Sequence, residues 1–260
     1  MSTQQDINKM PPAILRIPLE LREQIYDYLL ALDTPGQGSY PLPGVGITSV
    51  SLAPPSTSLL LLHPTITAEL LDHFYSQAKS KIILSHAFNF FRTDPELRHL
   101  ESSIALQRMR KIELVFFQDI LLLKDYPSFG LESFCAEIRR RADRACDVLL
   151  QASRLQHLTV SWIDTTRIGG WDEKSHILEP LRKLRDHVRV SIGDVRVSGD
   201  LETEAEDRDA FGRALEQALE TPIVRLRQED VLPDDEKPSD LRLLAFDVRQ
   251  LPIAATSMAT

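Results

Sequence analysis

Apolar residues recur every three or four positions along several stretches of this chain and alternate with polar residues in others. The first pattern predicts helices with one buried face, and the second predicts strands that lie in a sheet. Helices are predicted at 18–31, 64–75, 95–107, 131–149 and 177–184, with another containing Phe211, Leu215 and Leu219. Strands are predicted at 81–85, 111–117, 155–162 and 187–192, and closing strands at 223–226 and 241–248.

Helical and strand-like segments alternate from residue 95 onward, and the strands share a pattern of the type Leu-x-x-Leu-x-Val. Such alternation favours parallel strands joined by crossovers, so the expected fold class is α/β (or α+β). The units are spaced irregularly, and no strict repeat of about 20–29 residues is visible. Two architectures stay open, a degenerate leucine-rich-repeat-like sheet and a compact α/β sheet.

Proline and glycine are concentrated at 33–58, which predicts a long loop with neither helix nor strand. The other divisions follow from composition and charge runs. They are a disordered lead-in at 1–12, a helical region at 13–84, an α/β region at 85–250 with solvated acidic linkers near 200–209 and 229–240, and a frayed tail at 251–260.

Composition narrows the class of protein without naming a function. The 260 residues are 43% hydrophobic and 26% charged, which is ordinary for a soluble globular protein. The net charge of −8 argues against a nucleic-acid binder that relies on general phosphate attraction, although it leaves room for a local basic face. No apolar run approaches the roughly 18 residues of a membrane span, and the N-terminus lacks the layout of a secretion signal.

Catalytic and metal-binding motifs are missing from the sequence. There is no Gly-x-Ser-x-Gly turn, no histidine pair with metal-ligand spacing and no complete phosphate loop, so we expect no catalytic residue, metal or cofactor. Cys135 and Cys146 share one predicted helix and lie about 16 Å apart along its axis, too far for a disulfide. Two unpaired thiols fit the cytoplasm or the nucleus.

Two surface segments suggest recognition. The segment 162–171 holds Trp162, Asp164, Arg167 and Trp171, and this variety of side chains is interpreted as a recognition loop. An alternative function is a small-molecule-binding or enzymatic α/β domain that uses strand-end loops near 162–171 and 193–199. A weaker alternative is a nucleic-acid contact through Arg139–Arg144, although a solvated face paired with nearby acids is favoured for these arginines.

The most specific pattern lies at 14–30. Pro18 occupies a position where a helix begins, because its missing N–H is one that the first turn leaves unpaired. Leu21, Ile25, Tyr28 and Leu29 then follow at i, i+4, i+7 and i+8, forming one apolar stripe. Two uses of this stripe stay open: it packs inward as a cap on the core, or it stays exposed and binds a partner.

This segment resembles the first helix of F-box and F-box-like domains in the form common in filamentous-fungal proteins. A second segment, ending in a Phe-Tyr pair, is similar to the continuation of that motif, with Pro64-Thr65 in place of its cysteine-containing core. The matching residues are Pro18, Glu20, Leu21, Arg22, Ile25, Tyr26, Tyr28, Leu29 and Leu30, with Ile17 for the usual leucine, and then Leu61, Leu62, Ile66, Glu69, Leu70, Phe74 and Tyr75.

The resemblance implies a non-enzymatic interaction module whose first helices dock onto a Skp1-like adaptor of a cullin ubiquitin ligase. The remaining chain would select an unknown substrate protein, and neither a membrane nor nucleic acid is expected as a partner. The insertion at 33–58 departs from the compact three-helix F-box. The implied partner-binding residues are Pro18, Leu19, Leu21, Ile25, Tyr26 and Leu29.

Overall fold

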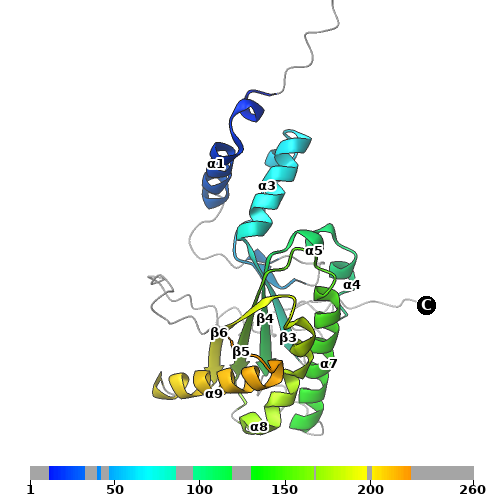
Figure 1. Cartoon of the computed structure of the whole chain (residues 1–260), viewed down its shortest axis with the longest axis vertical. Coiled ribbons are helices and arrows are strands. Elements are labelled where there is room, and N and C mark those ends of the chain that lie inside the picture. Colours follow the sequence, from blue (N-terminus) through cyan, green and yellow to red (C-terminus); the bar gives the residue numbers. More distant parts are fainter. Residues whose placement is uncertain are drawn as a thin grey trace, which may run out of the picture. The chain divides into compact units, whose positions relative to one another are not determined.

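Within the residues that the computed structural model describes, six strands pair in sequence order to form one mixed sheet (Figure 1). β1, β2 and β3 pair antiparallel, and β3, β4, β5 and β6 pair parallel. The described residues are 12–32, 40–41, 47–85, 96–118, 130–166, 168–197 and 201–223. The strands are β1 (Tyr40–Pro41), β2 (Ser49–Val50), β3 (Lys79–Ser85), β4 (Lys111–Gln118), β5 (His157–Asp164) and β6 (Arg189–Val197).

Helical segments connect the parallel strands, as the alternation along the sequence predicts. Each connection returns the chain beside the strand it has just left, so the strand order in the sheet follows the sequence. The fold class is therefore α/β, as expected. The segments are α4 (Arg98–Glu101) and α5 (Ile104–Arg108), then α7 (Leu131–Leu149), then α8 (Trp171–Lys174), η3 (Ser175–Ile177) and η4 (Glu179–Leu184), and finally α9 (Leu201–Leu219) after β6.

One face of the parallel strands is apolar and forms the centre of the core. Phe116 of β4 lies beside Trp162 of β5, and their ring centroids are 5.9 Å apart. Phe211 of α9 packs at the same distance from Trp162, which places α9 on this face. α7 adds the stripe that its spacing predicts, and its buried residues include Cys135, Ile138, Ala142, Ala145 and Leu149.

The opposite face of the parallel strands carries mostly polar side chains. Ser161 donates a hydrogen bond to Glu113 at 2.7 Å across β5 and β4. The same hydroxyl accepts the Asp194 N–H at 3.0 Å, where the register of β5 and β6 shifts. Such a bulge places two residues opposite one, and here it brings the Gly193 backbone close to Ser161.

The N-terminal helical segments are η2 (Ala13–Arg16), α1 (Leu19–Leu32), α2 (Thr57–Leu60) and α3 (Pro64–Gln77). Pro64 lies in the first turn of α3, and the His63 ring accepts the Thr65 N–H at 3.2 Å as an N-cap. α1 packs against α3, and α3 in turn contacts α5 and β4. The predicted helices at 18–31 and 64–75 are confirmed.

Several sequence predictions about local structure are wrong. The segment predicted as one helix at 95–107 contains two short helices, because Ser103 caps α5 by accepting the Ala105 N–H at 3.1 Å. The predicted helix at 177–184 is formed by 3-10 segments. Pro180 lies in the first turn of η4, where its missing N–H costs no hydrogen bond.

Two segments predicted as irregular contain regular structure. The acidic run near 200–209 is the first half of α9, because Phe211, Leu215 and Leu219 bury one side of this helix. Acidic residues near a helix N-terminus are also favoured by the helix dipole. Within the predicted loop at 33–58, β2 pairs with β3 and β1 pairs with β2, and α2 begins at Thr57.

The predicted boundary between a helical region at 13–84 and an α/β region at 85–250 falls within β3. This strand pairs along its whole length with β4, so it belongs to the same sheet as the strands that follow it. The proposed strand-end loop at 193–199 belongs to β6 as far as Val197. Outside the described residues lie the lead-in at 1–11, the linker at 229–240, the closing strands at 224–226 and 241–248, and the tail at 251–260.

No helix among the described residues is both long enough and apolar enough to cross a membrane.

We expect the bulge at Gly193 to tolerate no side chain. A Cβ at this position would meet Ser161 Oγ and would lie 2.7 Å from Thr159 Cγ2, so Gly193→Ala should lower the free energy of unfolding by about 1–3 kcal/mol. Gly170→Ala is the control, because nothing lies within 4 Å of a Cβ there. Chemical denaturation of both variants measures the difference, and equal stability would contradict the packing argument.

Candidate functional site

α1 is fastened to α3 by a network that converges on one carboxylate. Arg22 donates two hydrogen bonds to Glu69, from Nε at 2.8 Å and from Nη2 at 2.6 Å. Tyr26 donates its hydroxyl proton to the same carboxylate at 2.9 Å. Arg22 and Tyr26 are one helical turn apart and therefore reach α3 from the same side of α1. This bidentate geometry fixes the orientation of α1 as well as its position.

The hydrogen bonds of this network favour the ionised form of the Glu69 carboxylate. The hydrogen bonds from Arg22 lower the pKa of Glu69, against the opposing effect of burial. Burial, followed by the hydrogen bond to Glu69, raises the pKa of Tyr26 to about 12. Because the pKa of Glu69 is lower in the folded chain, the pair stabilises the fold above the ordinary glutamate pKa of about 4.3. That stabilisation is lost as the pH falls through the lowered pKa.

A second contact between the two helices lies close to the first. His73 of α3 is 2.6 Å from the carboxylate of Asp27, and its ring centroid is 6.1 Å from that of Tyr26. Tyr26 is buried between these groups, and Leu30 is buried one turn further along α1. The side of α1 that faces α3 is thus filled by the chain itself.

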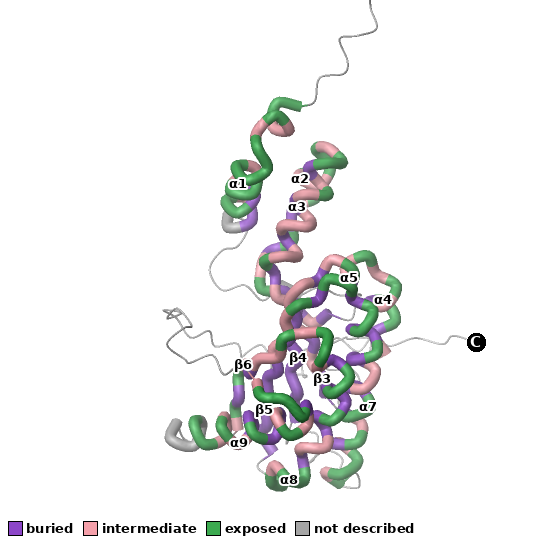
Figure 2. The backbone as a smooth tube through the Cα atoms, viewed as in Figure 1, coloured by how far each residue is buried: buried purple, intermediate pink, exposed green. Residues whose placement is uncertain are grey.

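The remaining surface of α1 is open (Figure 2). Leu21 is 48% exposed and Tyr28 is 66% exposed, and Leu19 at the helix start is also exposed. Leu21 and Tyr28 are seven residues apart, about two helical turns, so they lie on one side. Ile25 lies between them and is half-buried. The stripe is therefore exposed at Leu21 and Tyr28 and partly packed at Ile25 and Leu29.

The residues predicted to bind a partner are divided between these two sides. Tyr26 is only 1% exposed, so the expectation that it contacts a partner is wrong: its ring packs toward α3 and its hydroxyl is bound to Glu69. The others line the open surface or its margin. Pro18, Leu19 and Leu21 are exposed, and Ile25 and Leu29 are half-buried.

The predicted recognition loop at 162–171 is largely interior. Trp162 and Asp164 are each 1% exposed, because they belong to β5 and point to the apolar face of the sheet. Trp171 begins α8, and its ring packs against Trp162 and Phe211 at centroid distances of 5.2 and 5.5 Å. Surface exposure of Trp162 and Asp164 was therefore the wrong expectation, and Arg167 lies outside the described residues.

Asp164 has a structural partner that sequence reasoning missed. Lys174 of α8 reaches it at 2.5 Å, and Thr166 donates to it through both its N–H and its hydroxyl. Both charged side chains are nearly inaccessible. Asp164 and Lys174 are ten residues apart, a spacing that no helix or strand periodicity explains. The sequence alone therefore does not predict their contact. The pair ties α8 to the end of β5.

The arginines of α7 are occupied by nearby acids, as the favoured interpretation of that face expects. Arg139 pairs with Glu179 at 2.5 Å, and Arg140 pairs with Glu96 at 2.8 Å. Glu137 binds both Arg140 and Arg141 from the preceding turn, and Arg144 pairs with Glu101. Little unpaired charge is left on this face for a phosphate backbone.

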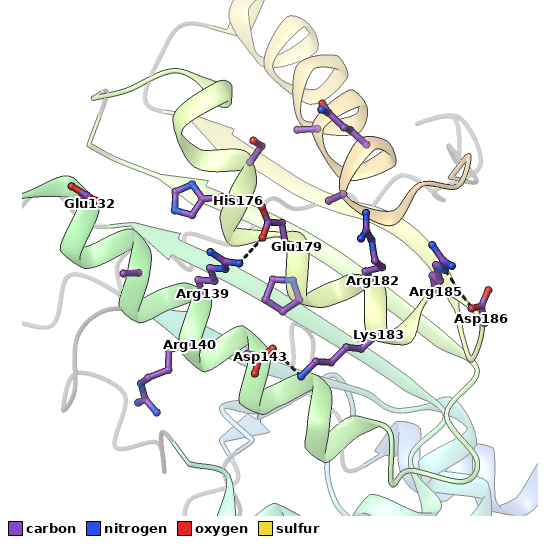
Figure 3. Close-up of a pocket in the computed structure, with 16 residues that line it drawn as sticks. Glu132, Arg139, Arg140, Asp143, His176, Glu179, Arg182, Lys183, Arg185 and Asp186 are labelled. Atoms are coloured by element: carbon purple, nitrogen blue, oxygen red, sulfur yellow. Dashed lines mark hydrogen bonds and ion pairs between the residues drawn. The ribbon is translucent and has the colours of Figure 1, made fainter.

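One groove, with a volume of about 1270 Å³, lies between α7, the η3–η4 segment and α9 (Figure 3). Lys183 binds Asp143 and Asp147 at 2.8 and 2.6 Å, and Arg185 binds Glu220 at 2.9 Å. Each other cation that lines the groove also has an acidic partner; these are Arg139, Arg140 and Arg182. The groove is not lined by residues 162–171 or 193–197, so it does not form the enzymatic site suggested for those segments.

The two cysteines behave as structural residues. Both are free and buried, as their places on the apolar stripe of α7 predict. Burial raises the pKa of both Cys135 and Cys146, which disfavours the reactive thiolate. The described part of the chain also contains no group of three His, Cys, Asp or Glu side chains placed to hold a metal ion.

Comparison of the chain with protein-family models, with curated proteins and with solved structures finds no match.

We expect Glu69→Gln to loosen α1 while leaving the sheet folded. The amide cannot accept two charge-assisted bonds from Arg22, and the loss should cost about 1–2 kcal/mol. Hydrogen exchange followed by mass spectrometry should show faster exchange across residues 19–30 and unchanged exchange in β4 and β5. Asp72→Asn is the control, because Asp72 lies on α3 but pairs with Arg108 and Arg154. Equal protection of α1 in both variants would contradict this account.

Breaking the buried pair of α8 should cost much more than breaking a surface pair. Asp164→Ala leaves Lys174 charged and enclosed, so we expect a loss of roughly 3–5 kcal/mol in the free energy of unfolding. Glu179→Ala removes the exposed partner of Arg139 and should cost about 1 kcal/mol or less. Urea denaturation separates the two, and a similar loss in both would show that burial of the pair is unimportant.

Proposed function

We propose that this chain is a non-enzymatic interaction protein that binds a partner through the open side of α1. The observation that carries the proposal is the division of this helix into two apolar sides. Tyr26 and Leu30 are buried against the chain itself, whereas Leu21 and Tyr28 are exposed. A helix that merely caps a core needs only the first of these sides.

The geometry of a helix separates the two sides. Successive residues are rotated by about 100°, so Tyr26 and Tyr28 point in nearly opposite directions. The side of α1 that carries Arg22 and Tyr26 faces α3, because both residues donate hydrogen bonds to Glu69. Leu21, Ile25 and Tyr28 then occupy the other side at i, i+4 and i+7, which are the anchor positions of a helix that docks into an apolar groove.

Burial of these anchors would supply useful binding energy. A leucine or an aromatic side chain that passes from exposed to buried contributes roughly 1.5–3 kcal/mol. Leu61 and Leu62, which precede α3, are also strongly exposed and offer further apolar surface in the same N-terminal region. The network at Glu69 holds α1 in a fixed orientation before binding, which reduces the entropy lost on association.

The partner that we propose for this side is a Skp1-like adaptor, as the resemblance of residues 14–30 to F-box-like domains implies. The chain would then act as a substrate-recruiting subunit of a cullin ubiquitin ligase, with its α/β region selecting the substrate protein. The two free thiols fit the reducing conditions of the cytoplasm or the nucleus, where such a ligase would work.

The test is a pull-down of the full chain with a purified Skp1-like adaptor. Wild-type protein should bind, and Leu21→Asp or Tyr28→Asp should reduce binding at least about tenfold, because each places a charge on the apolar anchor side. Ile168→Asp is the matched control, since Ile168 is 49% exposed, as Leu21 is at 48%, but lies after β5. The control should bind like the wild type.

Circular dichroism should show that all of these variants remain folded, because the substituted residues are exposed. Absence of binding by folded wild-type protein would overturn the adaptor proposal. A uniform loss in Leu21→Asp, Tyr28→Asp and Ile168→Asp would show that the open side of α1 has no special role.

A further inference from the structure

The four parallel strands begin with a row of basic side chains. The pairing register places Lys79 of β3 opposite Lys111 of β4, Lys111 opposite His157 of β5, and His157 opposite Arg189 of β6. Residues in register on neighbouring strands point to the same face of a sheet. This N-terminal row, Lys79, Lys111, His157 and Arg189, therefore lies across one end of the polar face.

The N-terminal row is accessible. Arg189 is exposed, the side chain of Lys79 is 43% exposed, and Lys111 and His157 are half-buried. Lys81, two residues further along β3, points to the same face and is also partly exposed. A ligand that approaches this end of the polar face would meet these groups first.

Only one acidic residue lies within the first two positions of this face. Glu113 is 3.4 Å from the Lys79 ammonium and 3.9 Å from that of Lys81. It also accepts the hydrogen bond from Ser161 and is almost fully buried, so its charge is already shared among these neighbours. Glu113 is not paired with Lys111 or Arg189, the other two permanently basic members of the row.

Among the described residues, Lys111, His157 and Arg189 have no ion pair with any carboxylate. This differs from several arginines and lysines of α5, α7 and η4, which form close ion pairs. Acidic residues exceed lysines and arginines by 38 to 30 in the sequence, so acids are not scarce. Within the described part of the chain, these three side chains therefore lack an acidic partner on a protein that is acidic overall.

Folding alone gives no reason for this arrangement. Neighbouring strands are about 4.8 Å apart, and like charges directly opposite each other destabilise a sheet. A segment that carries negative charge would remove this repulsion by lying across the strands. The row spans three strand spacings, roughly 14 Å, which is the length of four or five residues of extended peptide.

We propose that the N-terminal row binds a short acidic peptide segment of a protein partner. The chemistry favours a peptide over a nucleic acid. The row and the next position on each strand, which are Lys81, Glu113, Thr159 and Ser191, contain no tryptophan, tyrosine or phenylalanine on which bases could stack. The net charge of −8 also repels a long polyanion more than a short one. This site is separate from α1 and does not depend on adaptor binding.

The experiment measures fluorescence anisotropy of a labelled octaglutamate peptide titrated with the full chain at about 50 mM salt, where exposed charges are weakly screened. Wild-type protein should bind, and the double variant Lys111→Gln/Arg189→Gln should bind about tenfold more weakly. The matched control is Arg98→Gln/Arg213→Gln, which removes two exposed arginines outside the row and changes the net charge equally. It should change the affinity by less than about twofold.

A stability measurement distinguishes a binding role from a structural one. Because the row places like charges together, Lys111→Gln/Arg189→Gln should leave the melting temperature unchanged or raise it. A lower melting temperature together with weaker binding would overturn the proposal, because the row would then be serving the fold. The Leu21→Asp variant should bind octaglutamate like the wild type, so failure of the adaptor proposal would not affect this result.

Three other results would also overturn the proposal. The first is no binding of octaglutamate by folded wild-type protein, and the second is an equal loss of affinity in the row variant and the matched control. The third is tighter binding of an eight-nucleotide oligothymidylate with the same dependence on Lys111 and Arg189, which would assign the row to a nucleic-acid backbone.

Discussion

The parallel register of β3, β4, β5 and β6 is the constraint on which the other features depend. The register aligns four basic residues at the starts of these strands, Lys79, Lys111, His157 and Arg189. Because successive side chains of a strand point to opposite faces, this alignment also fixes the face to which each later side chain points. Leu114, Phe116 and Trp162 are thereby gathered under α7 and α9, while Glu113 and Ser161 meet on the other face. A shift of one residue in any of these strands would exchange the two faces. The register of the parallel strands thus determines both the apolar core and the basic row.

A second organising contact is the carboxylate of Glu69, which receives both Arg22 and Tyr26. This contact explains why residues 14–30 contain more than the apolar stripe of an amphipathic helix: Arg22 and Tyr26 are also needed to bind Glu69. Polar and aromatic residues on one side of α1 fix its orientation on α3, and the aliphatic and aromatic residues on the other side are thereby presented to solvent. The charge network and the open apolar surface are properties of the same helix.

Periodic patterns located the elements well, and long-range partners were not predictable. The helix at 131–149 and the strand at 111–117 were predicted almost to the residue. The helix buries one face with regular spacing, and the strand is a short, mostly apolar run that is buried on both faces. The segment after Trp162 was misjudged because a tryptophan followed by charged residues resembles an exposed loop, whereas Lys174 returns to neutralise Asp164. Likewise, no local signal connects Arg22 to Glu69 across 47 positions. The apolar stripe of α1 was found, but its division into two sides required the orientation of α3.

The sequential order of the sheet also leaves two terminal strands among the described elements, β1 and β6. A terminal strand exposes backbone groups to which another chain could add, with aggregation as the result. β1 is only two residues long and ends in Pro41, which has no N–H to donate. β6 is longer, but its register shifts near Gly193, and Arg189, Asp194 and Arg196 place charge along it. Along the described part of β6, the bulge and these charges disfavour the addition of a strand from a second molecule.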